Sequence, residues 1–145
     1  CPKPIVAWGN NGSGQLNVPP PNSGFVAVAA GVQHSLGLKS DGSIGSGSCT
    51  PNPCASLPTG PGLAAGGYPS LGLKVNSSIV AWGRNDDGQC TVPAPNSDFV
   101  GLAAGWYHSL GLKSNGSIVA WGDNGDGQGN VPAPNSDFSG VAPGG

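Results

Sequence analysis

A repeat of about 39 residues constrains this chain more than any other feature. The stretch Ile5-Val-Ala-Trp-Gly9 returns at Ile79 and Ile118, and a degraded copy starts at Ile44, so successive starts are 39, 35 and 39 residues apart. A unit this short cannot bury a core alone and becomes stable by stacking on its neighbours. The sequence predicts one repeat domain over residues 1–145, with repeats starting near 5, 44, 79 and 118 and an incomplete last repeat.

Each repeat divides into four short segments with the composition of β-strands. Apolar or small residues fill each segment, Gly, Pro, Asn or Asp bounds it, and none shows helical periodicity. In the first repeat the segments are Ile5–Gly9, Gln15–Val18, Phe25–Gly31 and His34–Lys39. Asp-Gly in residues 40–43 and Asn-Gly in residues 114–117 predict tight hairpins. These features predict an all-β fold, a β-propeller-like array of about four blades of four antiparallel strands.

Blades that stack face to face need apolar or small residues on both sides of each sheet. The segments 26–30 and 36–38 satisfy this need, because they carry no charged residue. Trp8, Trp82 and Trp121 are the largest recurring side chains, and we expect them to pack between blades rather than to stack on a ligand.

Composition argues against several functional classes. Charged residues make up 8% of the chain, and its five Lys and Arg residues are scattered, whereas a nucleic-acid-binding surface needs them clustered. No apolar run approaches the ~20 residues that span a membrane. No activated nucleophile or pair of catalytic carboxylates can be assembled from the sequence. We therefore expect no nucleic-acid partner, no membrane insertion, no cofactor and no enzymatic activity.

The loops at one end of the blades differ most between repeats. The corner loops join the third and fourth segments above and hold residues 32–33, 67–68 and 106–107. The outer loops follow each Ile-Val-Ala-Trp-Gly stretch and hold residues 10–14, 84–88 and 123–127. In an up-and-down blade both sets emerge on one end, here called the loop face. Aromatic and charged side chains there suit a protein interface. The predicted partner-binding residues are Gln33, Tyr68, Arg84, Asp86, Trp106, Tyr107 and Asp123.

The order of these motifs resembles the regulator of chromosome condensation repeat family. The residues that carry the resemblance are Ile5–Gly9, Gly14-Gln15, Val18-Pro19, Phe25–Gly31 and His34–Lys39, and three repeats match closely. The resemblance implies blades of a seven-bladed propeller, of which this chain would be about half. The short period is closest in style to secreted bacterial members such as the propeller-type β-lactamase inhibitor protein. In that relative the same loops contact the partner enzyme, which points to the loop face here.

Four cysteines and three Asn-x-Ser sequons favour an extracellular or cell-surface location. Cys49 and Cys54 bracket the shortened outer loop of the degraded repeat, and we expect a local disulfide between them. Cys1 and Cys90 have no assigned pairing, and Cys90 also suits a plain strand position. The candidate glycosylation sites are Asn11, Asn76 and Asn115.

No metal site is predicted. His34 and His108 occupy equivalent positions and suit structural hydrogen bonds, because no neighbouring ligands have metal-binding spacing. The Asp-rich loop 123–127 lacks the alternating ligands of a calcium loop.

Three functions remain open at this stage. The first is a secreted binding module for a protein partner. The second is a structural repeat protein that self-associates at the extracellular surface. The third is a lectin that binds carbohydrate through its Asn- and Asp-rich loops.

Overall fold

A computed structural model describes residues 6–7, 16–18, 22–32, 34–41, 44–46 and 62–144. These residues form three antiparallel sheets of three strands each, which confirms the all-β repeat array. The strands are β1 (Phe25–Ala30), β2 (Ser35–Lys39), β3 (Ile44–Ser46), β4 (Gly62–Ala65), β5 (Pro69–Leu73), β6 (Ile79–Gly83), β7 (Phe99–Ala104), β8 (His108–Lys113) and β9 (Ile118–Gly122). The described part of the chain contains no helix long and apolar enough to cross a membrane.

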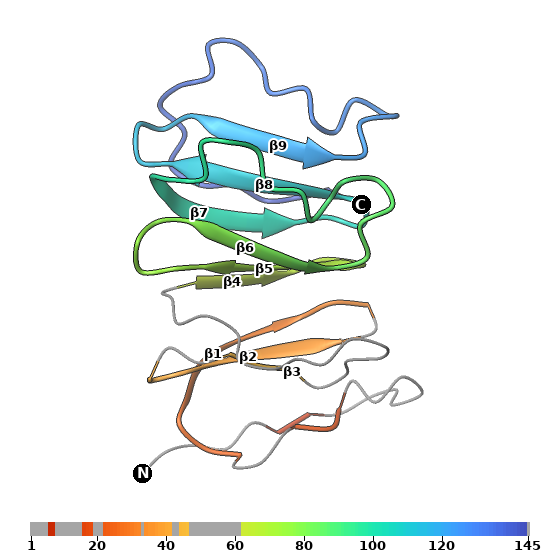
Figure 1. Cartoon of the computed structure of the whole chain (residues 1–145), viewed down its shortest axis with the longest axis vertical. Helices are drawn as coiled ribbons and strands as arrows, with labels where there is room; N and C mark the ends of the chain where they lie inside the picture. The colour runs from red at the N-terminus through yellow and green to blue at the C-terminus, as the bar shows by residue number, and fades with distance from the viewer. Residues whose placement is uncertain are drawn as a thin grey trace.

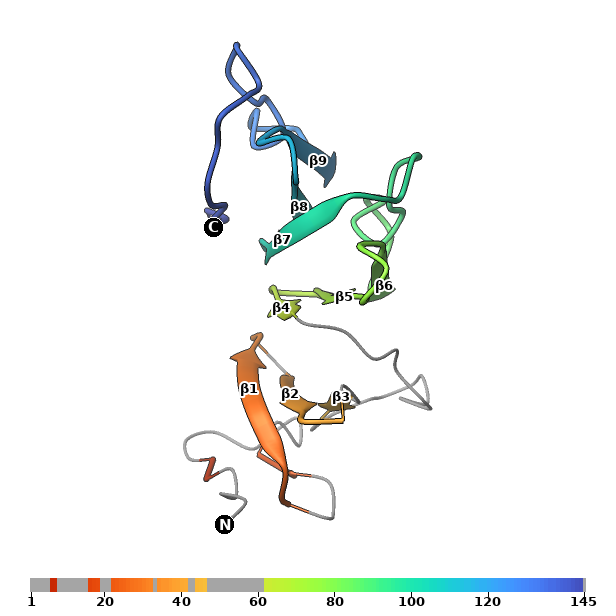
Figure 2. The ribbon, with the colours of Figure 1, turned by 90° about the vertical axis from the view of Figure 1, so that its left-hand side faces the viewer.

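The three sheets stack along the length of the molecule (Figure 1). Seen from the side, β1, β4 and β7 lie on one side of the stack, and β3, β6 and β9 lie on the other (Figure 2). β7 packs against β4 and β5 of the preceding sheet, and β4 packs against β1 and β2. Each sheet is therefore a blade whose first strand meets the blade before it.

The hydrophobic core lies between blades rather than inside any one of them. Between the second and third blades, Leu71 and Leu73 of β5 pack with Phe99 of β7 and with Trp121 of β9. Between the first and second blades, Leu36 and Leu38 of β2 are covered by Leu63, Ala65 and Trp82. The expected packing of the tryptophans is confirmed for Trp82 and Trp121, whereas Trp8 lies outside the described residues.

The hairpins between second and third strands form as predicted. In the third blade, the N–H of Gly116 donates to the carbonyl of Lys113 at 2.9 Å, and Gly116 has a φ of 80°. An Asn-Gly sequence favours this left-handed backbone conformation, because glycine adopts a positive φ without steric cost. Ser77 takes the same place in the second blade, with a φ of 62°.

The strand predicted after each outer loop (Gln15–Val18 in the first repeat) is not formed in the described copies. Residues 16–18, 89–92 and 128–131 lie in turns or irregular backbone. In the second copy, the N–H of Cys90 donates to Asn85 Oδ1 at 2.7 Å, and the N–H of Thr91 donates to the carbonyl of Gly88 at 2.9 Å. These local bonds use the donors that a strand ladder needs. Residues 138–144 also lack strand geometry.

Candidate functional site

The corner loops form a row across the three blades. In each corner a glycine N–H closes the turn; the N–H of Gly105, for example, donates to the carbonyl of His108 at 2.9 Å. Neighbouring corners are also joined, because the N–H of Gly67 donates to the carbonyl of Gly105 at 3.0 Å. The corner residues differ from blade to blade: Val32 and Trp106 are exposed, Tyr68 and Tyr107 are half-buried, and Gly67 is buried. Gln33, predicted to join them, lies outside the described residues.

Three aromatic side chains from two blades form one cluster. The ring centroids of Tyr68 and Tyr107 are 5.1 Å apart with the rings tilted at 35°. Tyr68 and Trp106 meet edge to face, with centroids 6.4 Å apart. Hydrogen bonding to Tyr68 raises the pKa of the Tyr107 hydroxyl, and the charge of Asp87 adds to the increase while Arg84 opposes it. The Tyr107 hydroxyl is therefore neutral near pH 7.

Arg84 covers this cluster from the outer loop of the second blade. Its guanidinium carbon lies 5.1 Å from the ring centre of Tyr68 and 5.8 Å from that of Tyr107, within cation–π range. Its Nε donates to Asp86 Oδ2 at 2.7 Å. This hydrogen bond and the carboxylate charge raise the pKa of Arg84. We call Tyr68, Arg84, Asp86, Trp106 and Tyr107 the aromatic cluster.

Asp123 adjoins the aromatic cluster from the third blade. Its backbone N–H donates to the carbonyl of Tyr107 at 3.0 Å. Its carboxylate accepts the N–H of Gly125 at 3.0 Å and the side-chain amide of Gln128 at 2.9 Å. The carboxylate of Asp123 therefore shapes its own loop as well as the loop face.

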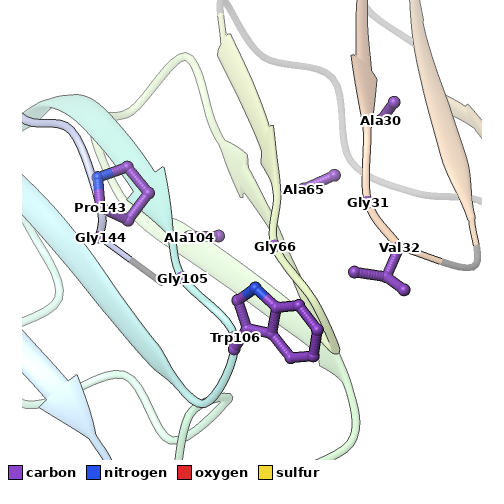
Figure 3. Close-up of a pocket in the computed structure, with 10 residues that line it drawn as sticks. All are labelled: Ala30, Gly31, Val32, Ala65, Gly66, Ala104, Gly105, Trp106, Pro143 and Gly144. Atoms are coloured by element: carbon purple, nitrogen blue, oxygen red, sulfur yellow. The ribbon is translucent and has the colours of Figure 1, made fainter.

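A shallow apolar groove runs beside the aromatic cluster. It holds about 410 Å³ and crosses the ends of β1, β4 and β7, where each blade contributes an Ala-Gly pair. Val32 and Trp106 stand on its loop-face side, and Pro143 and Gly144 of the C-terminal segment line it beyond Gly105 (Figure 3). Trp106 thus belongs to both the groove and the aromatic cluster.

One buried amide was missed by the sequence analysis. Gln89 has no exposed surface. Its backbone carbonyl accepts hydrogen bonds from the Ser109 hydroxyl and from the indole N–H of Trp121, each at 2.9 Å. Its side-chain Nε2 has no hydrogen-bond partner in the described part of the chain. In the next repeat, the side-chain amide of the equivalent Gln128 donates to the carboxylate of Asp123. In the second repeat, the residue equivalent to Asp123 is Arg84, which cannot accept a hydrogen bond from Gln89. The recurrence of Gly-Gln in each outer loop was the signal for this network.

One of the two histidines, His34, makes the expected structural hydrogen bond. His34 Nε2 lies 2.8 Å from the Ser70 hydroxyl of the next blade, and burial lowers the pKa of His34. His108 is buried, and burial lowers its pKa while the charge of Asp123 opposes the shift. Across the described residues, no three His, Cys, Asp or Glu side chains are grouped so that they could hold a metal ion.

Cys90 carries a free thiol in a turn rather than in a strand. The thiol donates to the carbonyl of Arg84 at 3.2 Å, and burial raises its pKa to about 11. Cys1, Cys49 and Cys54 lie outside the described residues.

Two of the three sequons fall on exposed hairpin turns. Oδ1 of Asn76 accepts the Ser78 hydroxyl at 2.7 Å, and Asn115 makes the same contact with Ser117. Both turns lie at the end opposite the loop face, whereas Asn11 lies outside the described residues.

Solved structures similar to this chain are propellers and related repeat domains. The ectodomain of the receptor kinase CR4 from Physcomitrella patens is 26% identical, covers 88% of this chain and matches with a TM-score of 0.71. Prp20p from Saccharomyces cerevisiae is 18% identical, covers 94% of this chain and matches with a TM-score of 0.69. This chain spans 38% of the first structure and 45% of the second, which is less than half of each.

A family model supports the same assignment in sequence. Residues 99–128, which run from β7 through β9 into the outer loop, match the regulator of chromosome condensation (RCC1) repeat. The matched stretch contains the motifs that recur in the other repeats, and the blades stack as they do in Prp20p and the other matched propellers. Residues 99–128 are therefore a repeat of the regulator of chromosome condensation type, and the other described blades share its fold.

Proposed function

We propose that this chain is a non-enzymatic binding module that holds a protein partner on its loop face. The observation that carries the proposal is the aromatic cluster, in which Trp106 stays 47% exposed although its neighbours hold it in place. A large exposed aromatic ring at a site built from two blades has no role in the core of this fold. Trp, Tyr and Arg are also the residues that dominate binding energy at protein interfaces.

The cluster is arranged before any partner arrives. Tyr68 and Tyr107 support each other, Arg84 lies over both rings, and Asp86 fixes Arg84. Side chains that already occupy one geometry lose less conformational entropy on binding. The repeats thus supply a rigid frame, and the loop residues that vary between blades supply specificity.

The comparisons support a protein-binding role. Prp20p of Saccharomyces cerevisiae binds Gsp1p and histones, which are proteins. CR4 of Physcomitrella patens and ACR4 of Arabidopsis thaliana are matched through their ectodomains. We extend the proposal to a secreted or surface-exposed chain, with a disulfide between Cys49 and Cys54 and glycans on its sequons when it is made in a glycosylating host.

Loss of the aromatic anchors tests the proposal. The double variant Trp106→Ala, Tyr107→Ala is expected to lose at least about 2 kcal/mol of binding free energy, which corresponds to a roughly 30-fold weaker interaction. The measurement is affinity capture of the partner from the source organism's extracellular fraction, followed by titration with the purified partner.

The double variant Ser114→Ala, Asn115→Ala on the opposite end is the matched control and should capture the partner like the wild type. Circular dichroism must show that both variants keep the native fold. Equal capture by a folded Trp106→Ala, Tyr107→Ala variant contradicts the proposal.

A further inference from the structure

The outer loops after β6 and β9, with the residues that follow them, have the same backbone conformation. Oδ1 of Asn85 accepts the N–H of Cys90 at 2.7 Å, and Asn124 makes the same bond with Gly129. In each loop a glutamine Oε1 accepts the N–H two residues before it, at 3.0 Å in the second blade and 2.9 Å in the third. The glycine before that glutamine has a φ of 76° in one loop and 81° in the other. Equivalent residues of the two loops can therefore be compared atom by atom.

In the third blade, two donors of this loop hold a carboxylate. Oδ1 of Asp123 accepts the N–H of Gly125 at 3.0 Å, and Oδ2 accepts the side-chain amide of Gln128 at 2.9 Å. Each oxygen thus has its own donor, and the loop binds a carboxylate that the chain itself supplies.

The second blade keeps both donors but lacks the carboxylate. The equivalents of Asp123, Gly125 and Gln128 are Arg84, Asp86 and Gln89. Because Gln89 Oε1 makes the same bond as Gln128 Oε1, the Nε2 of Gln89 points toward the position equivalent to the Asp123 carboxylate. Gln89 has no exposed surface, and this Nε2 has no hydrogen-bond partner within the described residues. A buried donor without an acceptor is unfavourable, so an acceptor placed there would be stabilising.

Arg84 brings positive charge to this position but cannot satisfy the amide of Gln89, because a guanidinium only donates hydrogen bonds. Its side chain lies over two rings of the aromatic cluster, and its Nε donates to Asp86 Oδ2 at 2.7 Å. Both partners of that salt bridge are exposed, so it contributes little stability and the guanidinium can turn toward an incoming anion at low cost. The carboxylates of Asp86 and Asp87 oppose an anion, so we expect weak affinity for a free one.

We infer that this loop of the second blade binds a carboxylate from outside the loop, in the place that the Asp123 side chain takes in the third blade. One oxygen accepts the amide of Gln89, the other accepts the N–H of Asp86, and Arg84 pairs with the charge. The carboxylate enters beside Arg84, since Asp123 reaches the equivalent donors from that backbone position. It belongs either to an acidic residue of a protein partner or to a free small carboxylate. The site goes beyond the proposed function and does not depend on it.

Titration with sodium formate tests the site, with sodium chloride at equal ionic strength as the reference. The readouts are the NMR signals of the Gln89 side-chain amide and the Asp86 backbone N–H in ¹⁵N-labelled protein. Both signals are expected to shift with one common dissociation constant in the millimolar range. The side-chain amide of Gln128 is the internal control and should not shift, because Asp123 already occupies it.

Two variants at position 84 connect the shifts to the missing carboxylate. Arg84→Asp restores the third-blade residue, so the Gln89 amide should shift without formate and formate should cause no further change. Arg84→Ala leaves both donors in place and removes the positive charge, so it should bind formate about five-fold more weakly than the wild type. The backbone NMR spectrum must show that both variants keep the native fold.

Three results overturn the site: no common shift of the Gln89 and Asp86 signals, an equal shift with chloride, or a folded Arg84→Asp variant in which formate still moves the Gln89 amide. Partner capture then distinguishes the two sources of the carboxylate. Formate weakens capture more than chloride does if the partner supplies the group, and capture is unchanged if the ligand is a free carboxylate. Loss of capture in the Trp106→Ala, Tyr107→Ala variant bears on the proposed function alone, whereas the formate titration bears on this site alone.

Discussion

At the scale of single residues, Gly111 shows why the Leu-Gly-Leu pattern recurs. A Cβ built on Gly111 would lie 2.5 Å from Phe99 Cε1 and 2.7 Å from Phe99 Cδ1. The glycine thus makes room for the Phe99 ring, which is only 1% exposed. Lys113 covers the same ring, with Nζ 4.2 Å from its centre, and donates to the carbonyl of Ser97 at 2.6 Å. One glycine and one lysine therefore hold the first residue of the blade in place.

Gly111→Ala is expected to destabilise the fold by about 1–3 kcal/mol, because the new methyl group overpacks the core against Phe99. The measurement is urea unfolding followed by tryptophan fluorescence. Gly140→Ala is the matched control, since no atom lies within 4 Å of its Cβ position. Equal unfolding midpoints for the two variants would show that Phe99 does not depend on this space.

At the scale of elements, an asparagine side chain pins the start of the third strand in the second and third blades. Oδ1 of Asn96 accepts the N–H of Ile79 at 2.7 Å, and its Nδ2 donates to the carbonyl of Ile79 at 2.7 Å. Asn135 makes the same pair of bonds with Ile118. The Pro-rich connection between blades therefore holds the strand through a side chain where its prolines cannot donate.

Replacement of these two asparagines by alanine is expected to destabilise the fold to different extents. Asn96→Ala should cost about 1–3 kcal/mol of stability, because it leaves two partly buried backbone groups of Ile79 without their partner. Asn135→Ala should cost less, since its bonds to Ile118 are exposed. Urea unfolding of the two variants checks this order, and a larger loss at Asn135 would contradict it.

The elements that the sequence predicted well are those with repeated apolar composition. The three strands of the third blade start at Phe99, His108 and Ile118, the equivalents of Phe25, His34 and Ile5 in the first predicted repeat. The segment after each outer loop (Gln15–Val18 and its equivalents) has similar composition, but side-chain bonds from Asn85 and Asn124 to backbone donors hold it in a turn. The asparagines recur at equivalent positions (Asn11, Asn85 and Asn124), but apolar composition does not show that their side chains bond backbone donors, so the turn was not foreseen.

At the scale of the whole molecule, variation between near-identical repeats located the candidate site. Tyr68, Arg84, Asp86, Trp106 and Tyr107 were predicted on one face, and the structure brings them into one cluster. The groove was not foreseen, because its lining is the Ala-Gly end of each first strand, which the sequence assigns only to packing. The groove forms only when the blades stack, and the spacing of residues in the sequence does not show how they stack.

Stability of the whole array is expected to depend on pH through its two histidines. Burial lowers the pKa values of His34 and His108 below 6.5, although Asp123 opposes the shift at His108. As the pH falls below about 6.5, the unfolded chain binds protons before the folded chain does, so the free energy of unfolding decreases. It should stay constant from pH 8 to 7 and decline from pH 6.5 toward 5.

Thermal or urea unfolding at these pH values checks the decline. The double variant His34→Gln, His108→Gln should show a flatter profile over the same window, even if its stability at pH 7 is lower. A wild-type profile that stays level or rises as the pH falls from 7 to 5 would contradict this assignment.

The central claim is that the protein engages its partner through the loop face. The most direct test replaces Trp106 with a photo-crosslinking amino acid and, in a second protein, replaces Ser114 on the opposite end in the same way. After irradiation with the extracellular fraction of the source organism, mass spectrometry identifies the adducts. The account predicts one dominant protein adduct from position 106 and none from position 114. Adducts from position 114 alone, or equal adducts from both positions, would contradict it.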